Sequence, residues 1–170
     1  MSKVPIRIIA ILEIGGGLCG MAFVIWTMIT QISNIFSEMI GIAEVLIHIF
    51  AVVAGITLWG GTSFGRKASL AIQLIQLPKI TSPAIIFLFS FGFDLWVHVS
   101  SSGVVGIQAS VFFNQLFFNV PNAPIDFGVS ITAIIALSIL KKYEPPSKTL
   151  LPLPPPPPDS WLVVDDRASK

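Results

Sequence analysis

The chain has 170 residues, of which 54% are hydrophobic and only 11% are charged, with a formal net charge of +1. Soluble domains carry roughly a quarter charged residues, so this composition argues against an ordinary water-soluble domain. The basic residues cluster in short stretches between long apolar runs, which argues against nucleic acid as a partner. The single cysteine, Cys19, excludes an intrachain disulfide.

The first part of the chain contains two apolar segments, residues 8–30 and 39–59, that predict transmembrane helices. A helix needs about 20 apolar residues to cross a hydrocarbon core of about 30 Å, because lipid offers no partner for an unpaired backbone group. The residues between the two segments include neither Lys nor Arg, so we expect an antiparallel helical hairpin. Residues 8–30 exceed the usual signal-peptide core of about 7–15 residues, and no small-x-small cleavage site follows, so we expect this segment to be retained.

Residues 70–99 are too long for one crossing and contain two prolines, so two interpretations remain open. In the favoured one, residues 70–77 form a short amphipathic helix along the cytoplasmic face. A third span over residues 82–99 then begins at Ser82, as N-cap, and Pro83.

In the alternative, one broken helix begins near Arg66 and places Gln73, Gln76 and Lys79 inside the membrane around the break. The first interpretation is favoured because a Lys at the bilayer centre costs about 2.5–3.5 kcal/mol. The alternative would suit a transporter, since discontinuous helices with polar residues at mid-membrane often build a transport site.

The residues from 100 to 123 are rich in Phe, and we expect them to form an amphipathic segment on the outer leaflet. A two-stranded hairpin is the other possibility, because Phe-rich runs also favour strands. Residues 125–140 predict a fourth, short span, whose end depends on snorkelling by Lys141 and Lys142. Asp126 would begin this helix, where the positive end of the helix dipole stabilises it.

The fold class predicted from these elements is an all-α membrane protein, a four-transmembrane-helix bundle with an interfacial amphipathic segment. The bundle occupies residues 1–143, and residues 144–170 form a proline-rich, disordered cytoplasmic tail. In this arrangement every Lys and Arg falls on one side, which predicts cytoplasmic N- and C-termini in a bacterial inner membrane or other plasma membrane. The four expected spans cover about residues 8–30, 39–59, 82–99 and 125–140.

Four ionisable residues inside the expected spans form the candidate polar site: Glu44, His48, Asp94 and His98. Each carboxylate stands four positions before its own His, so on a helix the two side chains share a face. If the second and third spans pack together, the four side chains converge. Such a group suits proton or ion handling, or zinc or iron binding, but mutually satisfied structural pairs are the interpretation that we favour.

Two further features concern packing. Glu13, in the inner half of the first span, is expected to pair with Lys79 or with a Gln of the third segment, or to reach the cytoplasmic interface. Gly16 and Gly20 form a Gly-x-x-x-Gly pattern that allows close helix approach, which we assign to packing within the monomer in preference to homodimerisation.

The resulting functional hypothesis is a non-enzymatic, multi-pass integral membrane protein that acts through helix packing with itself or with a membrane partner, in contact with the lipid bilayer. The alternative is a small proton- or ion-linked transporter with Glu44, His48, Asp94 and His98 as its polar centre. A metal-dependent membrane enzyme is the third possibility. No motif specifies a reaction, so no catalytic, metal-binding or cofactor-binding residue is assigned and no cofactor is expected.

Overall fold

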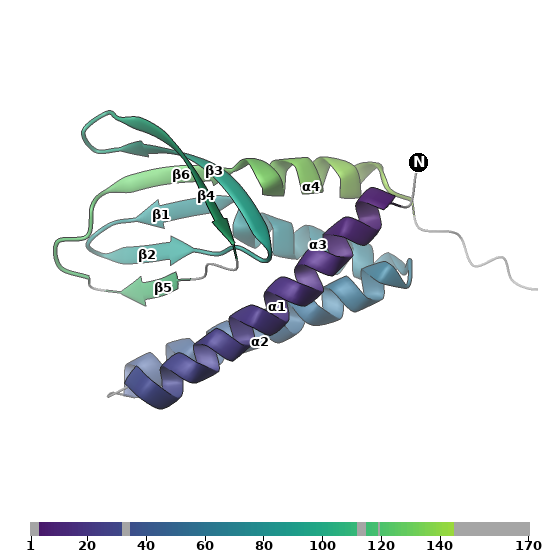
Figure 1. Cartoon of the computed structure of the whole chain (residues 1–170), viewed down its shortest axis with the longest axis horizontal. Coiled ribbons are helices and arrows are strands. Elements are labelled where there is room, and N and C mark those ends of the chain that lie inside the picture. Colours follow the sequence, from purple (N-terminus) through teal and green to yellow (C-terminus); the bar gives the residue numbers. More distant parts are fainter. Residues whose placement is uncertain (1–3, 32–34, 112–114, 119, 145–170) are drawn as a thin grey trace, which may run out of the picture.

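A computed structural model describes residues 4–31, 35–111, 115–118 and 120–144 of the chain. Two long helices, α1 (Val4–Gln31) and α2 (Ile35–Trp59), form an antiparallel pair. They are followed by α3 (Ser63–Gln76), a six-stranded antiparallel sheet and the short helix α4 (Ile131–Lys142) (Figure 1). The strands are β1 (Pro78–Thr81), β2 (Ile85–Leu88), β3 (Phe93–Ser100), β4 (Val105–Val111), β5 (Gln115–Phe118) and β6 (Asp126–Ser130).

The α1–α2 hairpin confirms the first two predicted helices. With 28 and 25 residues, the helices are about 42 and 37 Å long, and both are long and apolar enough to cross a membrane. Small residues let them approach closely, because a Cβ on Gly17 would lie 2.7 Å from Cγ2 of Val52. A Cβ on Gly20 would likewise lie 2.7 Å from Nδ1 of the His48 ring. Of the predicted Gly-x-x-x-Gly pair, Gly20 therefore packs against α2, whereas Gly16 packs against Phe91 in the segment before β3. Both contacts lie within one chain.

Helix α3 is amphipathic and packs against both α2 and α4. Its first turn is capped by Thr62, whose hydroxyl accepts a hydrogen bond of 2.9 Å from the amide of Gly65. The helix ends before Pro78, which has no amide hydrogen to continue it. Its apolar residues join α2 and the segment after β2 in one core, formed by Ala51, Ala54, Ala68, Ile72, Phe89 and Phe91.

The sheet has the strand order β4-β3-β6-β1-β2-β5, and its register separates apolar from polar side chains. Directly opposed residues share a face, and successive residues alternate between faces. We call one side the apolar face. It consists of Pro78, Ile80, Ile85, Phe87, Phe93, Leu95, Val97, Val99, Val105, Ile107, Ala109, Val111, Leu116, Phe118, Phe127 and Val129.

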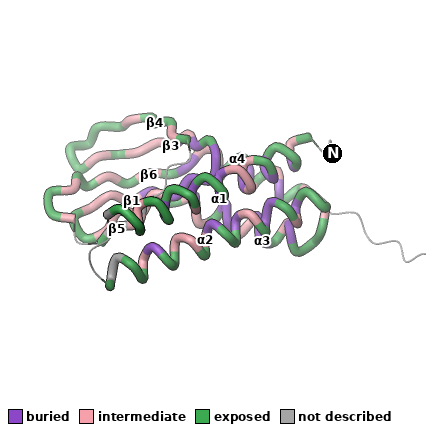
Figure 2. Tube along the Cα trace, turned by 60° about the horizontal axis from the view of Figure 1, so that its bottom comes forward, coloured by how far each residue is buried: buried purple, intermediate pink, exposed green. Residues whose placement is uncertain are grey.

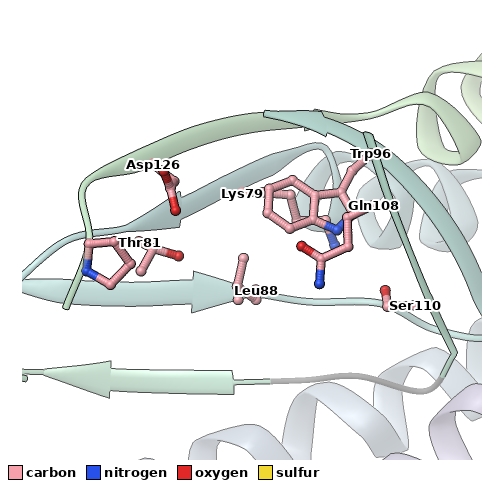
Figure 3. Close-up of a pocket in the computed structure, with 8 residues that line it drawn as sticks. Lys79, Thr81, Leu88, Trp96, Gln108, Ser110 and Asp126 are labelled. Carbon is pink, nitrogen blue, oxygen red and sulfur yellow. The ribbon is translucent and has the colours of Figure 1, made fainter. Parts of the chain in front are cut away.

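The opposite side, which we call the polar face, carries most of the polar side chains of the sheet. It includes Lys79, Thr81, Asp94, Trp96, His98, Ser100, Gln108, Ser110, Asp126 and Ser130. Gln108 on β4 and Leu88 on β2 line the same cavity, although three strands separate them in the sheet order. The sheet must therefore curl around its polar face and leave its apolar face outermost (Figures 1 and 3).

The prediction of an all-α bundle with four spans is wrong. Residues 82–99 contain β2 and most of β3, and residues 125–140 begin with β6. Helix α4 has 12 residues, so it is about 18 Å long and too short to cross a bilayer. The physical reason is that the alternation in these segments has the strand period of two, which a high overall apolar content conceals.

Local signals in the same segments were also misassigned. Ser82 does not cap a helix, because its hydroxyl accepts a 3.2 Å hydrogen bond from the amide of Ile85 and closes the turn between β1 and β2. The amphipathic helix expected over residues 70–77 is the second half of α3, which begins at Ser63 and packs within the molecule. The rest of both interpretations of residues 70–99 is wrong, because β1, β2 and β3 occupy the remainder. Asp126 begins a strand instead of a helix. The Phe-rich segment forms strands where it is described, as the hairpin alternative anticipated, but β5 pairs with β2 and β4 pairs with β3.

The contact between α1 and the segment before β3 is tight at Gly16, where an added Cβ would lie 2.7 Å from the Cα of Phe91. We predict that Gly16→Ala lowers the free energy of unfolding by about 1–3 kcal/mol, because the backbones would have to separate. Gly15→Ala is the matched control, since nothing lies within 4 Å of its Cβ position and alanine favours the helix. Thermal unfolding of the purified proteins in detergent measures both, and equal midpoints for the two variants would contradict the prediction.

Candidate functional site

The polar face contains a buried ion pair between β1 and β3. The ammonium nitrogen of Lys79 lies 2.6 Å from Oδ2 of Asp94, and the two side chains are 2% and 0% exposed. Lys79 also donates a hydrogen bond to the carbonyl of Phe89, and Ser130 donates one to Oδ1 of Asp94. Both charges are therefore compensated without water, as charges removed from water must be.

The ion pair is also connected to the start of α4. Ser130 is the N-cap of this helix, and its hydroxyl accepts a 3.0 Å hydrogen bond from the amide of Ala133. Close by, Thr132 accepts a 3.0 Å hydrogen bond from the amide of Leu95 on β3. Burial lowers the pKa of the Lys79 ammonium, and the Asp94 carboxylate acts in the opposite direction. The pair thus holds β1, β3 and α4 in one arrangement.

Beside the ion pair, the curled sheet encloses a cavity of about 170 Å³ (Figure 3). Its polar lining comes from four strands and consists of Lys79, Thr81, Trp96, Gln108, Ser110 and Asp126. Leu88 and Pro124 complete it. Within the described residues, the carboxylate of Asp126 takes part in no ion pair or side-chain hydrogen bond. The cavity therefore holds one carboxylate whose charge is not compensated by a described partner.

Two aromatic rings of β3 lie on the polar face, tilted by 42° to each other. The centroids of the Trp96 and His98 rings are 4.9 Å apart. Each ring occupies space over a glycine on a neighbouring strand, His98 over Gly106 of β4 and Trp96 over Gly128 of β6. A side chain at either glycine would displace the ring above it. The two glycines therefore allow the rings to pack against the backbone of the polar face.

The candidate residues of α2 lie elsewhere. His48 is fully buried at Gly20 of α1, and its ring packs edge-on against Phe91 at 5.2 Å between centroids. Neither of its ring nitrogens has a hydrogen-bond partner among the described residues. Glu44 is half-buried and accepts a hydrogen bond from the backbone amide of Leu116 on β5.

The structure therefore does not bring the four candidate residues into one group. Asp94 binds Lys79 and Ser130, His98 lies against Trp96, and Glu44 and His48 face different neighbours. In the part of the chain that is described, no three His, Cys, Asp or Glu residues lie close enough together to hold a metal ion. Asp94 and His98 do share a face, as expected, but of a strand and not of a helix.

Glu13 forms a second buried polar cluster, between α1 and α3. Its carboxylate accepts hydrogen bonds from Ser69 at 2.6 Å and from Gln73 at 3.0 Å. The predicted contact of Glu13 with a Gln of the third segment is thus confirmed. Nearby, the side-chain oxygen of Gln76 accepts a 3.1 Å hydrogen bond from the amide of Phe91, which connects α3 to the segment before β3.

The sequence alone does not identify Lys79 as the partner of Asp94. One feature of the sequence does indicate that both residues need a partner: Lys79 and Asp94 both stand in apolar surroundings, where an unpaired charge is not tolerated. The sequence offered His98 as a nearer partner, because the assignment assumed a helix. On a strand, residues four positions apart are about 13 Å apart, so Asp94 cannot bind His98 directly.

Comparisons with known proteins add no identity to this geometry: no protein-family model, no curated protein and no solved structure matches the chain.

The ion pair yields a stability prediction. Lys79→Met leaves the Asp94 carboxylate buried without a cation, and we expect the free energy of unfolding to fall by about 3–5 kcal/mol. The double variant Lys79→Met/Asp94→Leu should regain most of this loss, because no uncompensated charge remains. Chemical unfolding followed by near-UV circular dichroism measures the effect, with Glu38→Gln, an exposed carboxylate of α2, as the control. Additive losses in the double variant would show that the two charges do not stabilise each other.

Proposed function

We propose that this chain is a non-enzymatic, multi-pass integral membrane protein that acts through contacts made inside the membrane. In this proposal α1 and α2 cross the bilayer, and the apolar face of the sheet contacts lipid acyl chains in the outer half of the bilayer. The observation that carries the proposal is the composition of that face, which has an apolar residue at every position of all six strands.

The surface of the hairpin supports this placement. Many large apolar side chains of α1 and α2 point away from the rest of the molecule, which is the expected pattern for helices solvated by lipid. Exposed patches of this extent are rare on soluble monomers and mark membrane or protein contacts. They include Ile8, Ile11, Phe23, Trp26, Ile29, Met39, Ile42, Leu46, Ile49 and Ile56.

The strands of the sheet also carry exposed residues (Figure 2). Ile107 and Val105 of β4 are 71% and 66% exposed, and Phe127 of β6 is 58% exposed. An apolar outer face around a polar interior is the pattern of strands in lipid, and the reverse of a sheet in water. Open sheet edges are costly in hydrocarbon, so in this proposal the edges stay hydrated while the apolar face contacts acyl chains.

The positions of the basic residues support an orientation. Arg7 lies over the Trp59 ring at 5.3 Å, which places the start of α1 beside the end of α2. The guanidinium of Arg66 donates hydrogen bonds to the carbonyls of Leu140 and Lys141, at 2.9 and 2.8 Å. These basic stretches therefore gather at the end of the molecule opposite the α1–α2 turn (Figure 1). By the positive-inside rule this end is cytoplasmic, as are the described ends of the chain.

A proton- or ion-linked transporter centred on Glu44, His48, Asp94 and His98 receives less support, because the four side chains lie against different neighbours. The structural pairs expected from the sequence, Glu44 with His48 and Asp94 with His98, are also not formed. Glu44 contacts the backbone of β5, and Asp94 is neutralised by Lys79. The buried ionisable residues instead connect the hairpin to the sheet and the strands to each other.

The proposed topology predicts which sites are labelled from each side. In a Cys19→Ser background, Glu38→Cys lies near the turn of the hairpin and Glu144→Cys lies just after α4. We expect a membrane-impermeant maleimide to label the first site on intact cells, and the second only after the membrane is opened. Labelling of both sites from the same side would exclude two crossings.

The proposed lipid contact of the sheet has its own test. A nitroxide attached to Ile107→Cys should be more accessible to oxygen than to a water-soluble nickel complex in lipid vesicles, because oxygen partitions into hydrocarbon. The matched control is Ser102→Cys, in the exposed turn between β3 and β4, where the nickel complex should dominate. If the two sites show the same preference for nickel, the apolar face is not in lipid.

A further inference from the structure

We propose that the cavity on the polar face binds a small organic cation that carries a primary ammonium group. This site is independent of the membrane orientation proposed above, because it depends only on the curled sheet. It is formed by Asp126, Trp96 and the polar side chains of Thr81, Gln108 and Ser110.

The charges around the cavity favour a cation over an anion. Among the described residues, Lys79 is the single basic residue that lines it, and its ammonium is engaged by the Asp94 carboxylate and the Phe89 carbonyl. This leaves no cationic hydrogen-bond donor for an incoming anion. Asp126, by contrast, has no described ion-pair or side-chain hydrogen-bond partner, so the cavity carries one uncompensated negative charge.

The neutral groups favour an ammonium over a bare metal ion. An ammonium has three N–H donors, and the Asp126 carboxylate, the Thr81 and Ser110 hydroxyls and the Gln108 carbonyl supply acceptors. The Trp96 ring forms one wall (Figure 3), and an indole attracts a cation placed over its face. The small hydrocarbon part of an alkylammonium would contact Leu88 and Pro124.

The size of the cavity limits the ligand. The volume of the cavity is about 170 Å³. Pockets for drug-sized ligands hold about 300–1,000 Å³, so only a molecule of a few non-hydrogen atoms fits. Ethylammonium is a suitable probe, because it combines one ammonium with a two-carbon chain.

The test is titration of purified protein in lipid nanodiscs with ethylammonium chloride, at constant ionic strength set with sodium chloride. Binding is followed by saturation-transfer NMR of the otherwise native protein. It is also followed by the fluorescence of Trp96 in a variant whose other tryptophans, Trp26, Trp59 and Trp161, are replaced by Phe. We expect a saturable signal, and Asp126→Asn should weaken the affinity by at least about tenfold, the loss of one charge-assisted contact.

Matched controls separate this site from unspecific binding. Glu38→Gln removes an exposed carboxylate of α2 that does not line the cavity, and it should leave the affinity unchanged. Sodium acetate tests whether the site requires a positive charge, and ethanol tests whether the two-carbon chain alone is enough. Neither should compete with ethylammonium. The proposal is overturned by the absence of a saturable ethylammonium signal, by equal binding of acetate, or by unchanged affinity in a folded Asp126→Asn variant. Displacement by sodium at equal concentration would assign the site to a metal ion and overturn it as well.

Discussion

The buried ion pair of Lys79 and Asp94 is the interaction on which the arrangement of the sheet depends. Two charges removed from water are tolerated only when each is compensated, and here they compensate each other across β1 and β3. These strands are not neighbours, because β6 lies between them. The pair therefore acts over the central strand, and Ser130 at the end of that strand binds the same carboxylate. Any arrangement that moved one strand away would leave a charge uncompensated inside the molecule.

The ion pair fits a sheet that encloses its polar face and exposes its apolar face, the reverse of a sheet in a soluble protein. Soluble sheets bury their apolar face and hydrate the polar one, but here the side chains that need compensation lie inside the curl. The apolar face is covered only in part, where Phe87 and Leu116 pack against the core formed by α2 and α3. Bulk lipid would solvate the remainder, and the same medium suits the exposed residues of the hairpin. Lipid as the solvent would account for both the apolar face of the sheet and the exposed apolar residues of the hairpin. The membrane proposal therefore includes the sheet as well as the helices.

The sequence predicted the hairpin and the Glu13 contact but not the sheet, and the reasons are physical. A long apolar run has few interpretations other than a span, and Glu13 in such a run needed a polar partner from a neighbouring segment. In β3, by contrast, the alternation of Phe93, Asp94 and Leu95 onward has the period of a strand, but its high apolar content resembles a membrane helix. The pairing of Lys79 with Asp94 is set by strand order, which local sequence does not encode. The cavity was missed for the same reason.

The position of β6 has a consequence for how the molecule forms during synthesis. This strand is the last one in the described part of the chain, yet it lies at the centre of the sheet and pairs with both β1 and β3. The hairpins β1–β2 and β3–β4 have local contacts and can form early, but until residue 130 emerges they share no strand neighbour. Pairing between strands so far apart in sequence is slow, because the entropy of closing the loop is lost before the stabilising contacts form. The ribosome must therefore complete nearly the whole described chain before the two halves of the sheet can join.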